Sequence, residues 1–305
     1  MRSGLVSDRR AYRCGYCIQL PKAISLNQNE SRCFNIRLKD IATFNGSQWT
    51  LKTDLTVIDC QSFNIPAGAT LVIEGDKQLI NNGTINVYGT LVGLNTIINN
   101  GTINNYSNTI TIETGCIFTN NKTINNNSGA VITNNGGTIQ NEAVINNTGI
   151  IYNNKDAQID NKGTINNNNK LFNTGTIKNN KIITNEMDSI FENYAESIFE
   201  NYFTLNVKNI FNNSGTIINN KGGNINNLET MATINNLAGG IVTNKKGAFI
   251  NNKNGTFINN NSATINNNNG ASIYNYPGTK FNNTGTIVNN NIRPINIPIL
   301  KINNK

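Results

Sequence analysis

One short phrase, Thr-Ile-Asn-Asn with small variations, recurs along most of the chain and strongly limits the folds that it can adopt. The apolar residue of the phrase returns roughly every six to nine residues. Such a period is far too short for a helical hairpin and suits the arms of a β-helix. The clearest copies occupy residues 83–86, 101–105, 122–126, 163–167, 215–220, 232–236, 256–260, 263–267 and 285–290.

Side chains alternate along a strand, so each copy has two faces. The Ile and the last Asn point to one side, whereas the Thr and the first Asn point to the other. One Ile per strand cannot form a core alone, so we expect successive coils to stack and bury a continuous apolar column. The column is expected to contain Ile103, Ile124, Ile165, Ile234, Ile265 and Phe281.

The inward Asn at the end of each copy is expected to stack on its counterpart one coil away, at ~4.8 Å. Its amide can donate and accept along the stack, which satisfies polar groups whose burial would otherwise cost about 1–3 kcal/mol each. Asn and Gly also tolerate the left-handed backbone that a sharp corner requires. The expected ladder contains Asn105, Asn126, Asn167, Asn236, Asn267 and Asn283.

These patterns predict an all-β chain in which residues 77–291 form an Asn-rich parallel β-helix, or β-solenoid. Residues 1–76 have mixed charge and few Asn, and alternating segments at 49–58 and 69–74 predict a small β-rich capping or anchoring region. Residues 292–305 contain two prolines, which remove ladder donors and favour a cap or tail. With three arms per turn, the solenoid would have about nine or ten coils and a length of ~45 Å.

Two alternatives concern this repeat region. Asn-rich sequence is also typical of disordered, prion-like tracts. The apolar residues stay in phase with the Gly-Thr and Asn-Asn elements over roughly two hundred residues, which favours the solenoid. The phrase Ser-Ile-Phe-Glu-Asn-Tyr stands twice between Ser189 and Tyr202. A helix is conceivable there, but the eight-residue duplication favours two solenoid arms.

Composition excludes several classes of function. The chain has no His, so serine-protease triads, His-based zinc sites and His-dependent nucleases are ruled out. The formal net charge is +8, but the lysines are scattered and not interleaved with aromatic residues, which argues against nucleic-acid binding. The basic first forty residues leave an anchor for an anionic surface open.

Hydropathy argues against a membrane span and against classical secretion. No stretch approaches the ~20 apolar residues of a transmembrane helix. The first residues lack the unbroken apolar core of a signal peptide.

The five cysteines leave three interpretations open. Cys14 and Cys17 form a C-x-x-C pair that could bind a metal together with Cys33 and Cys60, but the last two are widely separated. The other two interpretations are disulfides among the five, of which Cys116 is the last, and reduced or buried thiols.

The catalytic candidates are acidic. Polysaccharide-degrading enzymes need two carboxylates ~5–10 Å apart on one groove, and the nominal pairs are Glu192 with Glu200 and Asp156 with Asp160. Outward, solvated side chains explain these residues equally, and calcium binding by the cluster from Glu186 to Glu200 is a further alternative. We therefore predict no catalytic residue, no cofactor and no metal site.

The outward threonines could align as an ice-binding array, but the unit length is irregular. The threonines concerned are Thr84, Thr102, Thr123, Thr164, Thr216, Thr233, Thr264 and Thr286. The Asn-x-Ser/Thr sequons follow from the composition and are poor evidence of glycosylation.

The Gly-Thr-Ile-Asn-Asn units resemble the Asn-rich repeat proteins of AT-rich, mimivirus-like giant viruses of amoebae, and they are similar to repeats of β-helical bacterial adhesins. The resemblance covers the chain from about Gly83 onward and implies a β-helical fold more firmly than a role. No functional residue transfers with it.

These observations lead us to expect a non-enzymatic structural protein, a component of the capsid surface or fibre layer of a virion. Its partners would be further copies of itself or other structural proteins. A β-helical adhesin that binds glycans is the first alternative, and a polysaccharide-degrading enzyme is the second.

Overall fold

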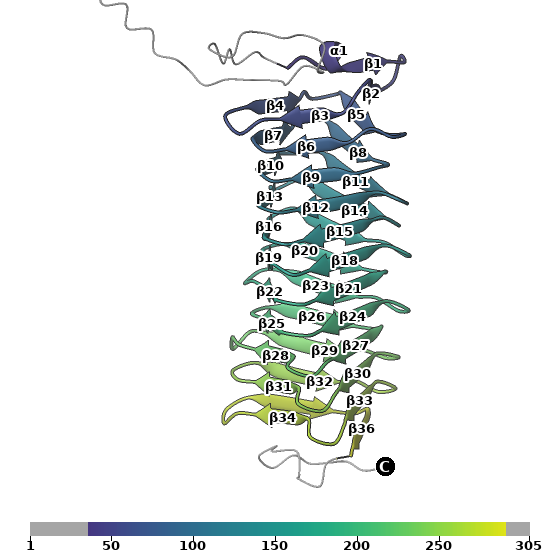
Figure 1. Ribbon diagram of the computed structural model, residues 1–305. Helices are drawn as coiled ribbons and strands as arrows, with labels where there is room; N and C mark the ends of the chain where they lie inside the picture. Colours follow the sequence, from purple (N-terminus) through teal and green to yellow (C-terminus); the bar gives the residue numbers. More distant parts are fainter. Residues whose placement is uncertain (1–35, 291–305) are drawn as a thin grey trace, which may run out of the picture.

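The chain forms a single stack of three-sided coils, a parallel β-solenoid, in a computed structural model that describes residues 36–290. Figure 1 shows the rod from the side, with turn following turn from one end to the other. Three strands make one turn, and each strand pairs in parallel with the strand three positions later in the chain. The predicted fold class is therefore confirmed.

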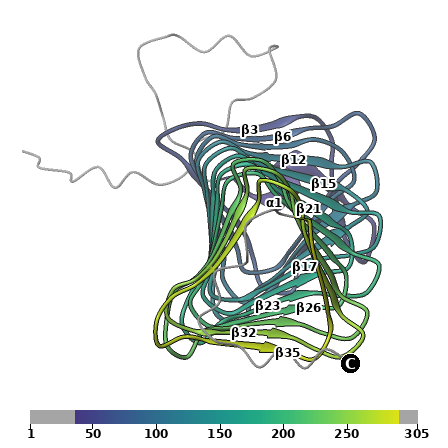
Figure 2. The same ribbon diagram turned by 90° about the horizontal axis from the view of Figure 1, so that it is seen from below.

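Three sheets, named A, B and C, form the sides of the rod, and Figure 2 shows them from one end around a closed interior. Sheet A has 12 strands. They are β3 (Leu55–Val57), β6 (Leu79–Asn81), β9 (Ile97–Asn99), β12 (Ile117–Asn120), β15 (Thr138–Asn141), β18 (Gln158–Asn161), β21 (Thr176–Asn179), β24 (Ile198–Asn201), β27 (Thr216–Asn219), β30 (Ile241–Asn244), β33 (Thr264–Asn267) and β36 (Thr286–Asn289).

Sheet C follows sheet A in each turn and has 11 strands. They are β4 (Ser62–Ile65), β7 (Thr84–Val87), β10 (Thr102–Asn105), β13 (Thr123–Asn126), β16 (Val144–Asn147), β19 (Thr164–Asn167), β22 (Ile182–Asn185), β25 (Thr204–Val207), β28 (Asn224–Asn227), β31 (Phe249–Asn252) and β34 (Ser272–Asn275).

Sheet B completes the turn and has 13 strands, the first of which pairs antiparallel. They are β1 (Ala42–Phe44), β2 (Trp49–Leu51), β5 (Thr70–Ile73), β8 (Thr90–Gly93), β11 (Thr109–Glu113), β14 (Val131–Asn135), β17 (Ile150–Asn153), β20 (Lys170–Asn173), β23 (Ile190–Asn193), β26 (Ile210–Asn213), β29 (Thr233–Asn236), β32 (Thr256–Asn259) and β35 (Lys280–Asn283).

The rod has more turns than the repeat phrase predicts. Strands β3 to β35 make eleven complete turns, not nine or ten, which corresponds to a length of ~53 Å. One of these turns comes from residues before the change of composition at residue 76, because β3, β4 and β5 already pair in parallel with the next turn. A turn needs inward apolar residues at alternate positions, and Phe63 and Ile65 supply them without Asn.

The first described residues close this end of the rod. Helix α1 (Leu38–Ile41) has four residues and leads into the hairpin of β1 and β2, which ends sheet B with an antiparallel pair. No helix within residues 36–290 is long and apolar enough to span a membrane. The expected tail at residues 292–305 lies outside the described residues.

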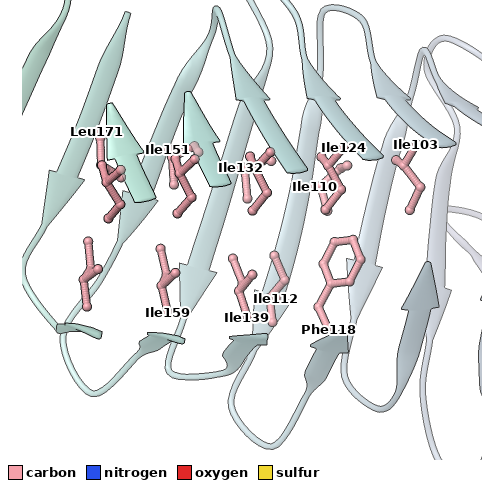
Figure 3. Close-up of a cluster of buried hydrophobic side chains, with 14 of the residues drawn as sticks. Ile103, Ile110, Ile112, Phe118, Ile124, Ile132, Ile139, Ile151, Ile159 and Leu171 are labelled. Atoms are coloured by element: carbon pink, nitrogen blue, oxygen red, sulfur yellow. The ribbon is translucent and has the colours of Figure 1, made fainter. Parts of the chain in front are cut away.

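The core is the apolar column that the alternation predicts. In most strands of four residues, the second and fourth side chains are buried and the other two are partly exposed. Figure 3 shows such side chains from several turns stacked inside the coil. Ile103, Ile124, Ile165, Ile234, Ile265 and Phe281 are all 4% exposed or less.

The duplicated segment at 189–202 forms two consecutive arms, β23 and β24, not a helix. It places aromatic rings in the middle of the core. The ring of Phe191 stacks on Phe211 with centroids 4.6 Å apart, and it meets Phe199 edge-on at 5.3 Å. Such pairs add about 0.5–1.5 kcal/mol each beyond the burial of their area.

Corner length, and not strand length, absorbs the irregular period of the sequence. Register partners in successive turns lie 18 residues apart at the shortest and 25 at the longest, as in Asn161 with Asn179 and Asn219 with Asn244. The strands nevertheless stay in register, with Ile above Ile and Asn above Asn. The irregular unit length therefore does not disturb the alignment of the faces.

Candidate functional site: the asparagine ladders and the outer faces

Inward asparagines at the strand ends form three ladders, one at each corner of the coil. We call them the A, B and C ladders after the sheets whose strands they end. In each, the side-chain Nδ2 of one Asn donates to Oδ1 of the Asn one turn later. Most of the stacked asparagines are 0% exposed, whereas at the C-terminal end of the rod Asn283 is half-buried and Asn289 is exposed.

The A ladder runs unbroken along the coil through eleven asparagines. Its Nδ2 to Oδ1 distances lie between 2.7 and 3.0 Å. Its members are Asn81, Asn99, Asn120, Asn141, Asn161, Asn179, Asn201, Asn219, Asn244, Asn267 and Asn289.

The B ladder begins later, and the C ladder is interrupted once. The B ladder contains Asn134, Asn153, Asn173, Asn193, Asn213, Asn236, Asn259 and Asn283. The C ladder contains Asn105, Asn126, Asn147, Asn167 and Asn185, and then Asn227, Asn252 and Asn275 after the interruption at Val207. The six asparagines singled out in the sequence thus lie in three ladders and not in one.

Each ladder amide also fixes the corner of the following turn. The second donor of Asn153 bonds the carbonyl oxygen of Thr176 at 3.0 Å, and that of Asn105 bonds Val131 at 2.9 Å. Asn is short enough to reach both acceptors, and its amide offers two donors and a carbonyl. This pairing explains why Asn occupies these positions.

All three ladders have the same polarity, because every Nδ2 points toward the C-terminal end of the rod. The first rung of a ladder therefore has no donor before it. Within residues 36–290, the Oδ1 atoms of Asn81, Asn105, Asn134 and Asn227 are buried without a hydrogen-bond partner. The residue one turn earlier is Val57, Val87, Ile112 or Val207 in these four cases, and none of these side chains can donate.

One expectation about the corners is wrong. The left-handed backbone does not fall on asparagine, since the described non-glycine residues with positive φ are Asp156, Asp188, Glu196 and Ser262. The ladder Asn is the last residue of its strand, or the last but one for Asn134, where extended backbone turns its side chain inward. The left-handed residue comes later, in the longer corners, where Gly is the commonest choice, as at Gly129 with φ 79°.

The acidic pairs do not converge on one groove. Glu192 lies on β23 in sheet B, whereas Glu200 lies on β24 in sheet A. Asp156 lies in a corner, and Asp160 lies outward on β18, where it accepts from Asn180 at 2.6 Å. Asp160, Lys178 and Glu200 are neighbours on successive turns of sheet A, so opposite charges alternate along that face.

Two notches between corner loops are features that the sequence did not indicate. One notch, of about 300 Å³, lies over the short corner at Gly175. It is bordered by the longer corners of the turns before and after, which carry Asp156 and Glu196. Another of about 600 Å³ is lined by Lys221, Lys245 and Lys246 beside Tyr202. Both lie where corners of unequal length are stacked, which only the stacking of turns reveals.

Aromatic side chains form short rows on the outside. The rings of Tyr152 and Phe172 lie 5.3 Å apart on sheet B, and Phe172 lies 6.0 Å from Tyr194. Burial raises the pKa of Tyr194 to about 12, with a further contribution from its hydrogen bond to Glu192. The phenol therefore stays neutral at physiological pH.

The described cysteines do not form a metal site. Cys60 is exposed, and Cys116 is buried, which raises the pKa of its thiol to about 12. No cluster of His, Cys, Asp or Glu suited to a metal occurs within residues 36–290. Cys14, Cys17 and Cys33 lie outside the described residues.

The outward threonines are divided among three faces. Thr84, Thr102, Thr123 and Thr164 lie on sheet C, Thr216, Thr264 and Thr286 lie on sheet A, and Thr233 lies on sheet B. On sheet C the threonines form a row that runs beside a second row, made by the outward asparagines at the third position of most strands. The threonines on sheets A and B have no such continuous second row.

The chain matches no protein-family model, no curated protein and no solved structure. The residues and their geometry therefore carry the functional argument.

Proposed function

We propose that the protein is a non-enzymatic structural component of a virion, in which the β-solenoid acts as a stiff rod at the particle surface or in its fibre layer. The observation that carries the proposal is the A ladder, which runs without a break from β6 to β36 and so links every turn after the first. The strands of successive turns are joined by backbone hydrogen bonds, and the ladder amides add side-chain hydrogen bonds in the same direction. Bending or unfolding one turn therefore breaks hydrogen bonds to the turns on both sides of it.

The outward chemistry supports a structural role over a catalytic one. The two carboxylates of the duplicated segment point from different sheets, and so do not supply the facing pair that glycoside hydrolysis needs. The resemblance of the repeat phrase to Asn-rich proteins of giant viruses supports the assignment to a virion.

Labelling of purified virus particles tests the location. Antibodies raised against residues 36–290 are expected to decorate the surface of intact particles in electron micrographs, and the chain should appear among the particle proteins by mass spectrometry. A chain that appears only in the infected cell and never in washed particles would contradict the proposal.

A glycan-binding adhesin is the second candidate, and the aromatic row of Tyr152, Phe172 and Tyr194 favours it. Aromatic rings in a row beside amide and hydroxyl groups are a suitable platform for sugar rings. A glycan array tests this candidate. Glycan binding that is lost in Phe172→Ala would favour the adhesin if it is retained in Phe249→Ala, which removes an exposed ring on a different face, sheet C.

A further inference from the structure

We propose that the outer face of sheet C is a self-association surface, on which a second copy of the chain docks face to face. This inference rests on the proposed role as a structural component, and it names the partner and the face.

The outward strand positions of sheet C carry no charged side chain. Its strands present two outward rows, one of mainly Thr and one of mainly Asn. The first row is Ser62, Thr84, Thr102, Thr123, Val144, Thr164, Ile182, Thr204, Asn224, Phe249 and Ser272. The second row is Asn64, Asn86, Asn104, Asn125, Asn146, Asn166, Thr184, Asn206, Asn226, Asn251 and Tyr274.

The other two faces differ in this respect. Sheet A presents Asp160, Lys178 and Glu200, and sheet B presents Lys170, Glu192 and Lys280 among its outward residues. The whole chain has a net charge of +8, which makes two copies repel each other at most approaches. Sheet C is the side where two copies can meet without bringing charged strand residues together.

The Asn row of sheet C is already ordered along the rod. Asn125 Nδ2 donates to Asn104 Oδ1 at 2.9 Å, and Asn146 and Asn166 continue the row at 2.9 and 3.0 Å. The outer row therefore runs opposite in polarity to the inner ladders. These bonds hold the side chains in fixed positions, and Asn125, Asn146 and Asn166 stay partly exposed with a second N–H on each amide.

Rows of identical asparagines on paired sheets are the arrangement found in steric zippers, where side chains of one sheet interdigitate with those of the other. Because the Asn amides are fixed before contact, little side-chain entropy remains to be lost on docking. The ordered, uncharged row thus favours a second sheet of the same kind over a charged partner.

The size of the face is sufficient for a stable dimer. Four residues across and eleven strands along give about 700 Å² on each copy. A full contact would bury about 1,400 Å² in total, which lies within the range of specific interfaces. Successive turns are rotated relative to one another, as Figure 2 shows, so two rods would have to coil around each other to use the whole face.

Two asparagines at the centre of the face provide the test. β16 and β19 are the fifth and sixth of the eleven strands of sheet C, so Asn146 and Asn166 meet the centre of the partner whether the rods lie parallel or antiparallel. We expect the full chain to dimerise in sedimentation equilibrium. The double variant Asn146→Lys with Asn166→Lys should associate at least about 30-fold more weakly, because like charges would face each other without water.

A matched control lies on sheet B. Asn212 and Asn235 occupy the same outward strand position and share the same kind of bond, at 2.8 Å. The variant Asn212→Lys with Asn235→Lys should associate within about 2-fold of the wild type. Mixing the sheet C lysine variant with Asn146→Asp and Asn166→Asp should restore the dimer, which a fault in folding could not do.

Several results would overturn the proposal. They are a wild type that stays monomeric up to millimolar concentration, an equal effect of the lysine pairs on sheets B and C, and a mixture of oppositely charged variants that fails to associate. A monomeric wild type that binds a polysaccharide through Asn146 would assign the face to that ligand instead. A monomeric wild type that unfolds at an undiminished midpoint would contradict self-association and leave the proposed rod function intact. Absence of the chain from virus particles would contradict the proposed function and leave the dimer unaffected.

Discussion

At the scale of single residues, the ladder asparagine is the most demanding position in the molecule. Asn161 accepts from Asn141 at 2.7 Å and donates to Asn179 at 2.8 Å and to the Ile182 carbonyl at 2.9 Å. Asn161→Ala should reduce the free energy of unfolding by about 2–4 kcal/mol, because Asn179 Oδ1 and the Ile182 carbonyl lose a buried donor. Urea unfolding followed by circular dichroism measures the loss.

Asn235→Ala is the control for that substitution. Asn235 also donates to an asparagine one turn away, Asn212, but it lies on the outside, where water replaces the bond. We expect a change within about 0.5 kcal/mol. If Asn161→Ala and Asn235→Ala reduced the free energy of unfolding equally, burial of the ladder amide would contribute nothing to stability.

A second residue-scale prediction concerns alkaline pH. Burial, with a smaller effect of the Glu113 carboxylate, raises the pKa of the Cys116 thiol from 9.0 to about 12. The unfolded chain releases this proton near pH 9 and the folded chain retains it, so stability is complete below pH 9 and falls as the pH rises toward 12. The slope from this one group is at most about 1.4 kcal/mol per pH unit.

Cys116→Ala should remove this contribution to the slope. Unfolding free energies of both proteins, measured from pH 8 to 11 under reducing conditions, give the comparison. Parallel curves would show that the thiol titrates alike in the folded and unfolded chains.

At the scale of strands and corners, a short corner requires a close approach of two backbones. A Cβ atom on Gly175 would collide with the carbonyl oxygens of Asn154 and Ala157 in the turn before it. Gly175→Ala should therefore destabilise the rod by about 1–3 kcal/mol. Asn169→Ala, in the preceding short corner of the chain, should change thermal stability little. A rod that tolerates both substitutions equally would exclude crowding at the Gly175 corner.

The strands were predictable from the sequence, but the corners were not. Period-2 alternation identifies which side chain of Thr123–Asn126 turns inward, and the burial pattern of β13 agrees. No local pattern reveals that Phe63 and Ile65 belong to the same solenoid as Ile85, because their strand does not end in the Asn that marks the later turns. The left-handed residue of a long corner can be Asp156 or Glu196 when neighbouring turns fix the backbone, so propensity alone placed it wrongly.

At the scale of the whole molecule, the rod is a one-dimensional stack in which each turn contacts only its neighbours. Removing one complete turn should therefore be tolerated. Residues 158–175 contain β18, β19 and β20 with their corners. Their deletion joins Ala157 to Thr176, so Thr176 takes the place of Gln158, its register partner one turn earlier. All three ladders close again, since Asn141, Asn147 and Asn153 would then meet Asn179, Asn185 and Asn193.

We expect the shortened chain to fold with a rod about 5 Å shorter in small-angle scattering and with a thermal midpoint within a few degrees of the full chain. Deleting β18 alone, residues 158–163, provides the contrast. It moves every later strand to the next side of the rod, so corners of different length become stacked, as the two-residue corner 180–181 would be on the four-residue corner 154–157. Stability should therefore fall further than with the complete turn removed. If the single-strand deletion were tolerated as well as the full turn, the inward residues and corners of the three sides would be interchangeable, and stacking of equivalent corners would contribute little to stability.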